Sequence, residues 1–226
     1  MSEAMKKNLK IVFANQKGGV GKTTLCMLFA NYLASKNKPV CVIDTDLQKT
    51  IFTQREDDLK ENGEEVEIPY VVQAFSLKDP ENVRQLMESV EETPGYFLFD
   101  APGNINEDGL VQLFAGADYI VCPYQYEKKT INSTGIFIEV INQLKDQIPQ
   151  MAAEMFFVPN KFDSRTGTVR ELQSYMATDD LFKKFGQVTP RIPQHIGLTR
   201  IDTISNSSDQ VKDVKGTFDY MIRNMK

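Results

Sequence analysis

The chain has 226 residues, of which 41% are hydrophobic and 25% are charged, a composition typical of a soluble globular domain. This length favours one domain, and ordinary Gly and Pro contents exclude a fibrous or largely disordered chain. No apolar run approaches the roughly twenty residues that a membrane-spanning helix needs. The N-terminal segment MSEAMKKNLK also lacks the apolar stretch of a secretory signal. We therefore expect a cytoplasmic protein that does not attach to membranes.

The net charge of −5 is distributed unevenly along the chain. Residues 1–182 carry 18 basic and 27 acidic side chains, whereas residues 183–226 carry eight basic and four acidic ones. The overall charge argues against a protein that coats DNA with its whole surface. A local basic face is expected only near the C-terminus.

The cysteine and histidine content excludes two classes of site. Cys26, Cys41 and Cys122 lie in apolar stretches without C-x-x-C spacing, and His195 is the only histidine. A zinc site or a disulfide framework needs more ligands or pairs than these. We expect the three cysteines to be buried as small hydrophobic residues.

Short apolar runs alternate with longer segments of helical spacing. The runs are nearly continuous in hydrophobicity, which is typical of strands buried on both faces. They are Lys10–Asn15, Val40–Asp44, Ile68–Val72, Tyr96–Asp100, Tyr119–Pro123 and Met155–Asn160. The predicted helices are Thr24–Lys36, Ile51–Glu61, Asn82–Glu91, Asp108–Phe114, Thr130–Gln147 and Val169–Tyr175. This alternation predicts an α/β fold with a doubly wound, mostly parallel sheet flanked by helices. Residues 9–226 are expected to form the single domain, after a disordered tail at residues 1–8.

Two further segments have simple structural interpretations. Glu56–Glu67 holds seven acidic residues and one lysine, which predicts a solvated helix end and loop. Ser207–Lys226 places apolar residues at helical spacing, but its apolar face is modest and its charge is mixed. We expect it to pack on the sheet rather than to lie on a membrane.

A glycine-rich segment, Gln16–Thr24, lies between the first predicted strand and the first helix. Glycines let the backbone wrap a polyphosphate, and the helix that follows adds its partial positive charge. In such a loop Lys22 reaches the β- and γ-phosphates, and the Thr23 hydroxyl binds Mg²⁺. The expected nucleotide-binding residues are Gly18, Gly19, Val20, Gly21, Lys22, Thr23 and Thr24.

The loop departs from the usual phosphate-loop pattern, because Gln16 replaces the first glycine and Lys17 follows it. The segment NQKGGVGKTT resembles the deviant Walker A loop of the ParA/MinD superfamily. The whole chain is similar to small ParA-type ATPases that lack an N-terminal DNA-binding domain. The resemblance implies a P-loop ATPase in which Lys17 reaches across a dimer interface to the partner's nucleotide.

Carboxylates follow two of the predicted strands. Asp44 and Asp46 come at the end of the second strand, on the ligand side of an open α/β sheet. Their segment resembles the family's D-x-D-P-Q run, with Leu47 in place of proline. The resemblance implies that Asp46 orients or activates the attacking water and that Asp44 supports Mg²⁺ through a water molecule.

Asp100 ends another apolar strand, which is the Walker B arrangement that holds Mg²⁺ through its hydration shell. The Pro102-Gly103 step that follows resembles a switch segment, in which the Gly103 N–H meets the γ-phosphate. The polar residues after it are expected to cap a helix and to continue the switch; they are Asn104, Asn106, Glu107 and Asp108.

Asn160-Lys161-Phe162-Asp163 permits two interpretations. As the N-K-x-D motif of GTPases, it would use Asp163 to bind the guanine edge. In the ParA-like interpretation, which we favour, Asn160 contacts adenine while Asp163 and Arg165 belong to a loop. The segment Thr189–Gln194 then resembles the family's strand and loop that close over the base, with Pro193 against it.

The resemblance implies a molecular switch that uses ATP and Mg²⁺. ATP would join two subunits as a homodimer, the dimer would bind DNA without sequence preference, and a ParB-like partner would stimulate hydrolysis to ADP and phosphate. The task would be the partitioning of a plasmid, mobile element or chromosome. The candidate DNA contacts are Lys183, Lys184, Arg191, Arg200, Lys212, Lys215 and Arg223. The alternatives are a MinD-like or other protein-positioning ATPase without DNA binding, and a relative that uses GTP.

Overall fold

A computed structural model describes residues 8–63, 66–104, 107–163 and 167–226. Within them, seven parallel strands form one sheet in the order β3-β2-β4-β1-β5-β6-β7. The strands are β1 (Asn8–Phe13), β2 (Val40–Asp44), β3 (Val71–Ala74), β4 (Gly95–Asp100), β5 (Tyr119–Tyr124), β6 (Glu154–Pro159) and β7 (Gln187–Val188). This arrangement confirms the predicted doubly wound parallel sheet.

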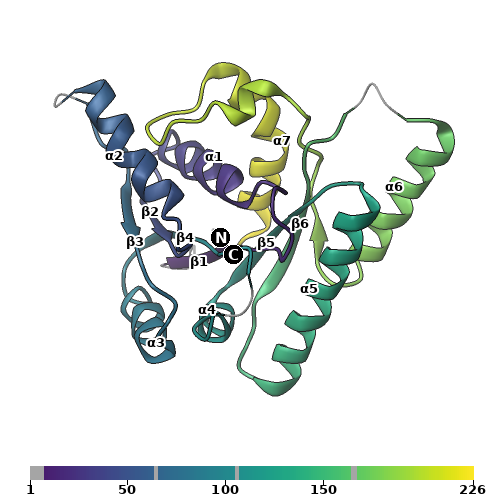
Figure 1. Cartoon of the computed structure of the whole chain (residues 1–226), viewed down its shortest axis with the longest axis horizontal. Coiled ribbons are helices and arrows are strands. Elements are labelled where there is room, and N and C mark those ends of the chain that lie inside the picture. Colours follow the sequence, from purple (N-terminus) through teal and green to yellow (C-terminus); the bar gives the residue numbers. More distant parts are fainter. Residues whose placement is uncertain (1–7, 64–65, 105–106, 164–166) are drawn as a thin grey trace, which may run out of the picture.

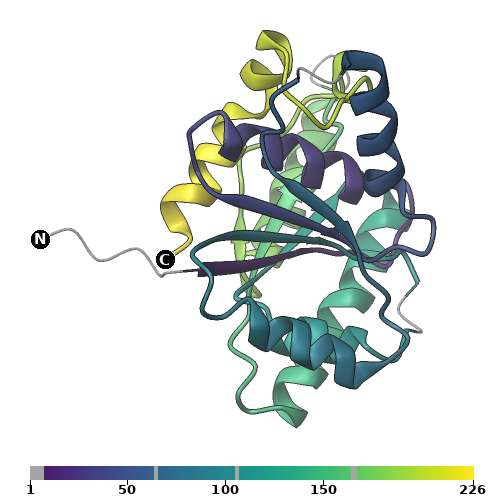
Figure 2. The same cartoon turned by 90° about the vertical axis from the view of Figure 1, so that its left-hand side faces the viewer.

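Helices cover both faces of the sheet (Figures 1 and 2). One face carries α1 (Lys22–Ala34), α2 (Thr50–Asn62) and α7 (Ser208–Asn224). The opposite face carries α3 (Pro80–Ser89), α4 (Leu110–Gly116) and α5 (Lys128–Gln147), and α6 (Val169–Phe182) lies beside α5. A short 3₁₀ helix, η1 (Ile196–Thr199), precedes α7. Because every strand is parallel, all strands deliver their carboxyl ends to the same edge of the sheet.

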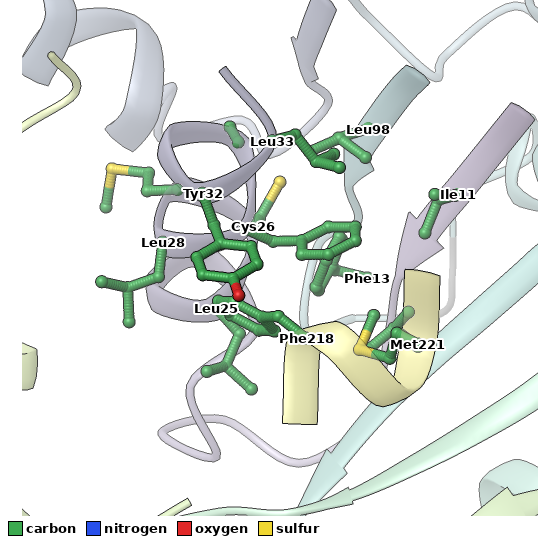
Figure 3. Close-up of a cluster of buried hydrophobic side chains, with 14 of the residues drawn as sticks. Ile11, Phe13, Leu25, Cys26, Leu28, Tyr32, Leu33, Leu98, Phe218 and Met221 are labelled. Carbon is green, nitrogen blue, oxygen red and sulfur yellow. The ribbon is translucent and has the colours of Figure 1, made fainter. Parts of the chain in front are cut away.

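The C-terminal helix α7 packs into the core beneath α1 (Figure 3). Its side chains Val214, Phe218 and Met221 are buried, and the Phe218 ring lies 4.9 Å from that of Phe29. The predicted packing of this segment on the sheet is confirmed, because its apolar face is already covered. Within the described residues, no helix is both long and apolar enough to cross a membrane.

Several predicted boundaries are wrong. The third strand begins at Val71 rather than Ile68, and it alternates between exposed and half-buried residues because it is an edge strand. The sequence shows apolar content but not the place of a strand in the sheet. Helix α6 continues to Phe182, and the two-residue β7 was not among the predicted apolar runs. Asn8 belongs to β1 and is buried, whereas residues 1–7 lie outside the described residues.

The sequence predicted that the acidic segment Glu56–Glu67 is a solvated helix end and loop. This prediction is wrong for part of the segment. Asp58 is buried and accepts hydrogen bonds from the Thr203 N–H and hydroxyl, at 2.7 and 2.8 Å. On the same helix, the buried Arg55 donates to Thr203 and to the Tyr70 carbonyl. The cysteine prediction also needs one correction, since Cys26 and Cys122 are buried but Cys41 is only partly so.

Candidate functional site

The glycine-rich loop joins β1 to α1 at the carboxyl edge of the sheet (Figure 1). Gly19 and Gly21 have φ angles of +78° and +100°, which residues with a Cβ atom rarely adopt. A Cβ atom at Gly21 would also collide with the Asn160 side chain. Lys17, Gly18 and Gly19 are exposed, so the loop backbone is accessible to a ligand at the N-terminus of α1.

Lys22, Thr23 and Asp100 meet where β4 ends beside this loop. The Thr23 hydroxyl donates to Asp100 Oδ2 at 2.7 Å. Lys22 is 9% exposed; burial lowers the pKa of its ammonium, while the nearby carboxylates of Asp100 and Asp46 oppose that shift. Burial raises the pKa of Asp100 to about 7, although the Thr23 hydrogen bond acts in the opposite direction. The site therefore holds a buried carboxyl group that a cation would stabilise in its charged form.

The arrangement of these residues fits a magnesium ion shared with phosphates. Asp100 Oδ1 is buried and accepts no hydrogen bond from the described residues. Among those residues, no group of three His, Cys, Asp or Glu side chains is placed to hold a metal ion. Mg²⁺ in nucleotide sites is held through one or two protein ligands, several waters and the phosphates. Thr23 and Asp100 are suitable for that mode of binding.

Asp44 and Asp46 follow β2 at the same edge but have different surroundings. Asp44 is fully buried, and its Oδ2 accepts from the Ile51 and Phe52 N–H groups at 2.8 and 3.1 Å. N–H groups in the first turn of a helix have no acceptor within that helix, so Asp44 caps α2 from outside it. Burial raises the pKa of Asp44, and these backbone donors oppose the shift. Asp46 is partly exposed, and its Oδ1 accepts from the Gln48 N–H.

Two further predicted residues lie near the phosphate loop. A Cβ atom at Gly103 would lie 3.5 Å from Lys22 Nζ, so Gly103 faces the lysine of the loop. Lys17 is exposed, and no described residue forms an ion pair with its side chain. Asn106 and Arg165 lie outside the described residues.

A pocket of about 360 Å³ opens beside the first turns of α1. It contains the predicted Asn160 and Pro193 as well as Thr24, and its remaining lining residues are Leu25, Leu28, Lys161, Gln194, His195, Ile196, Leu198 and Thr199. Because Thr24 directly follows Thr23, the pocket lies where a nucleotide with its phosphates on the loop would place its base. His195 was not among the predicted site residues, and only the tertiary fold brings it into one pocket with Asn160.

The N-K-x-D segment is attached to the phosphate loop. Asn160 Nδ2 donates to the Val20 carbonyl at 2.8 Å, and Lys161 Nζ donates to the Gly19 carbonyl at 2.7 Å. Asp163, however, lines a neighbouring cavity of about 330 Å³ together with Tyr126 and Tyr175, not the pocket beside α1. This placement favours the adenine interpretation over guanine recognition by Asp163.

The predicted DNA contacts differ in their exposure and in the partners of their side chains. Lys212, Lys215 and Arg223 of α7 line an open groove together with Lys36 and Asp219. Lys36, in the turn after α1, was not among these candidates, because it lies outside the basic C-terminal segment and only packing brings it beside α7. Lys215 forms an ion pair with Asp219, and Arg223 Nε donates to the Asp219 carbonyl. Lys183, Lys184 and Arg200 are exposed, and Lys183 forms an ion pair with Asp180. Arg191 is less exposed; it pairs with Asp179 at 3.1 Å and lies over the rings of Tyr126 and Phe162.

Comparisons with known proteins agree with this geometry. Residues 11–201 match the CobQ/CobB/MinD/ParA nucleotide binding domain. The chromosome-partitioning ATPase Soj of Thermus thermophilus is 26% identical over 202 residues, which cover 80% of this chain and 81% of Soj. The septum site-determining protein MinD of Bacillus subtilis is 24% identical over 168 residues, or 59% of each chain.

A solved structure shows the same fold. A putative plasmid partition protein of Borrelia burgdorferi, bound to AMPPNP, aligns with a TM-score of 0.72 at 17% identity. The alignment covers 97% of this chain and 99% of that one. The family match spans most of the chain and includes the phosphate loop, both carboxylate segments and the residues that line the pocket beside α1. The protein therefore belongs to the CobQ/CobB/MinD/ParA family of nucleotide-binding domains.

Proposed function

We propose that this protein is a Mg²⁺-dependent ATPase that acts as an ATP-dependent dimerisation switch in the partitioning of DNA. The observation that carries the proposal is the meeting of Lys22, Thr23 and Asp100 beside a pocket suited to a base. Mg²⁺, when bound, neutralises charge on the β- and γ-phosphates. ATP hydrolysis would yield ADP and phosphate at a weak basal rate.

Each residue has a proposed role in this reaction. The exposed loop backbone and Lys22 bind the phosphates, while Thr23 and Asp100 hold the ion. Asp46 orients the attacking water, Asp44 supports the ion through water, and Gly103 senses the γ-phosphate. Lys17 acts from one subunit on the nucleotide of the other. Asn160 and Pro193 bind the adenine.

The partitioning role is supported by Soj, the chromosome-partitioning relative, and by the basic groove between α1 and α7. We propose that the ATP-bound dimer binds DNA through this groove, without sequence preference, and that a ParB-like partner stimulates hydrolysis. Phosphate contacts release counterions, so affinity for DNA would fall steeply with salt. Nucleoid association would follow from this binding.

The first experiment measures binding of random duplex DNA by the Asp46→Ala protein in ATP, ADP or no nucleotide, over a range of salt concentrations. This variant should hydrolyse little ATP and so remain in the ATP-bound dimer. We expect DNA binding in ATP but not in ADP or without nucleotide. Lys212→Ala or Lys215→Ala should make the plot of log binding constant against log salt concentration less steep, by about one unit of slope for each lost phosphate contact. Lys60→Ala, an exposed lysine on α2, is the matched control.

Lys22→Ala should abolish nucleotide binding, because the contact with the β- and γ-phosphates is lost. Absence of DNA binding in every nucleotide, with an ATP-dependent dimer still present, would overturn the DNA role. It would favour a protein-positioning ATPase, as the relative MinD suggests. Tighter binding of GTP than of ATP would overturn the assignment of ATP.

A further inference from the structure

The outer wall of the pocket beside α1 is formed by residues that α7 holds in place. Gln210 of α7 is buried, and its Nε2 donates to the carbonyls of Gly197 and Arg200 at 2.8 and 3.0 Å. One turn further along α7, Asp213 Oδ2 lies 2.9 Å from His195 Nδ1. The segment from His195 to Arg200 is therefore fixed to α7 at both of its ends.

Among the side chains of this wall, His195 has a planar aromatic ring that can stack on a nucleotide base. Its imidazole lines the pocket, is 47% exposed and lies close to Gly197, where a Cβ atom would approach Nδ1 to 3.3 Å. The pocket also has an apolar lining, to which Leu25 and Leu28 of α1 contribute. A planar aromatic ring and apolar side chains in one pocket are suited to pack on a purine.

We propose that His195 is a base-recognition residue, whose imidazole packs on the purine of the bound nucleotide while Asp213 fixes its orientation. This inference rests on the proposed nucleotide site and extends it to two residues outside every motif of the sequence. Asp213 is a positioning residue, since it acts through the imidazole. Its carboxylate lowers the ordering cost of binding because the ring is already placed.

The test compares two probes, ATP and inorganic tripolyphosphate, on the full-length protein with Mg²⁺. Loss of a stacked ring costs about five- to tenfold in affinity at a half-exposed site, so His195→Ala should weaken ATP binding by that factor. Tripolyphosphate has no base, and its affinity should not change. His195→Phe keeps the ring and should restore most of the ATP affinity.

Asp213→Ala tests the positioning role. It should weaken ATP binding by about two- to fivefold, because the freed imidazole must then be immobilised on binding. The double variant His195→Ala/Asp213→Ala should bind ATP no more weakly than His195→Ala alone, since residues acting as a unit are not additive. Asp209→Ala, an exposed carboxylate in the first turn of α7, is the control and should bind ATP normally.

The outcomes separate this inference from the proposed function. If the wild-type protein binds neither probe, the proposal of a nucleotide site is itself wrong. If it binds both, and His195→Ala binds ATP as the wild type does, the role of His195 is wrong. Equal weakening of ATP and tripolyphosphate by His195→Ala would also overturn it, because the effect would then pass through the phosphate loop. Additive losses in the double variant would overturn the role of Asp213.

Discussion

At the scale of single residues, Asp100 has a conflict between burial and charge. The protein places a carboxyl group where Thr23 supplies one hydrogen bond and where the second oxygen has no partner among the described atoms. Burial without a cation disfavours the charged form of such a group. In the proposed function, Mg²⁺ would resolve this conflict, because a bound cation would stabilise the carboxylate that burial destabilises.

This conflict predicts how stability depends on pH in the metal-free protein. The pKa of Asp100 is about 7 in the folded protein against 3.8 for the ordinary side chain, so the folded state holds an extra proton between these pH values. Its contribution to stability therefore decreases as the pH rises from about 4 to above 7. Asp100→Asn should remove that decrease and raise the free energy of unfolding at pH 8 by about 2–4 kcal/mol.

Urea unfolding in EDTA at several pH values checks this expectation. The wild type and Asp100→Asn should have similar stability near pH 4 and should diverge as the pH rises. Glu92→Gln, at an exposed turn residue, is the control and should follow the wild type. Parallel curves for the wild type and Asp100→Asn would contradict the prediction.

At the scale of elements, α2 connects the nucleotide edge to the segment before α7. The helix begins where Asp44 caps its first turn, and it is held further along by Arg55 and Asp58, which share Thr203 as a partner. The Arg55 guanidinium also lies over the Tyr70 ring, 4.5 Å from its centroid. These contacts join distant parts of the chain, since Arg55 and Thr203 are separated by 148 residues in the sequence.

Arg55→Ala should lower the free energy of unfolding by about 2–4 kcal/mol, because it leaves the Tyr70 and Thr203 acceptors buried without a donor. Arg55→Lys keeps the charge but not the planar fork of donors, and it should have an intermediate effect. Denaturant unfolding measures these changes. Lys60→Ala removes an exposed ion pair with Asp57 on the same helix and should leave the stability nearly unchanged. An equal effect of Arg55→Ala and Lys60→Ala would show that the buried network contributes nothing.

At the scale of the whole molecule, all proposed nucleotide contacts lie along one edge of the sheet, and Lys17 is exposed there. We expect Lys17→Ala to leave nucleotide binding by the monomer unchanged but to weaken ATP-dependent dimerisation, because only the trans contact is lost. Sedimentation velocity of the Lys17→Ala/Asp46→Ala protein in ATP measures this. Lys78→Ala, another exposed lysine, is the control. Complete dimerisation of the Lys17 variant would exclude a role across the interface.

The sequence by itself determined the parallel sheet and the loop for which the phosphate contacts are proposed. A ligand that wraps a loop touches consecutive residues, so Gly18 to Thr24 can be proposed as its contacts without a structure. Buried parallel strands are likewise continuous apolar runs, and Asp44 and Asp100 follow directly from the ends of two of them. The exceptions were β3 and β7, the two edge strands, because a position at the edge is a property of the sheet and not of the strand.

Only the tertiary structure decided which distant side chains complete these local patterns. Nothing near Arg55 in the sequence indicates that it is buried, and nothing near His195 indicates that Asp213 holds its imidazole. Such pairs depend on how α2 and α7 pack on the sheet, and packing is set by the summed burial of many residues. Local patterns therefore predict the loops that bind phosphates, whereas the walls of the base pocket are determined by the packed core beneath them.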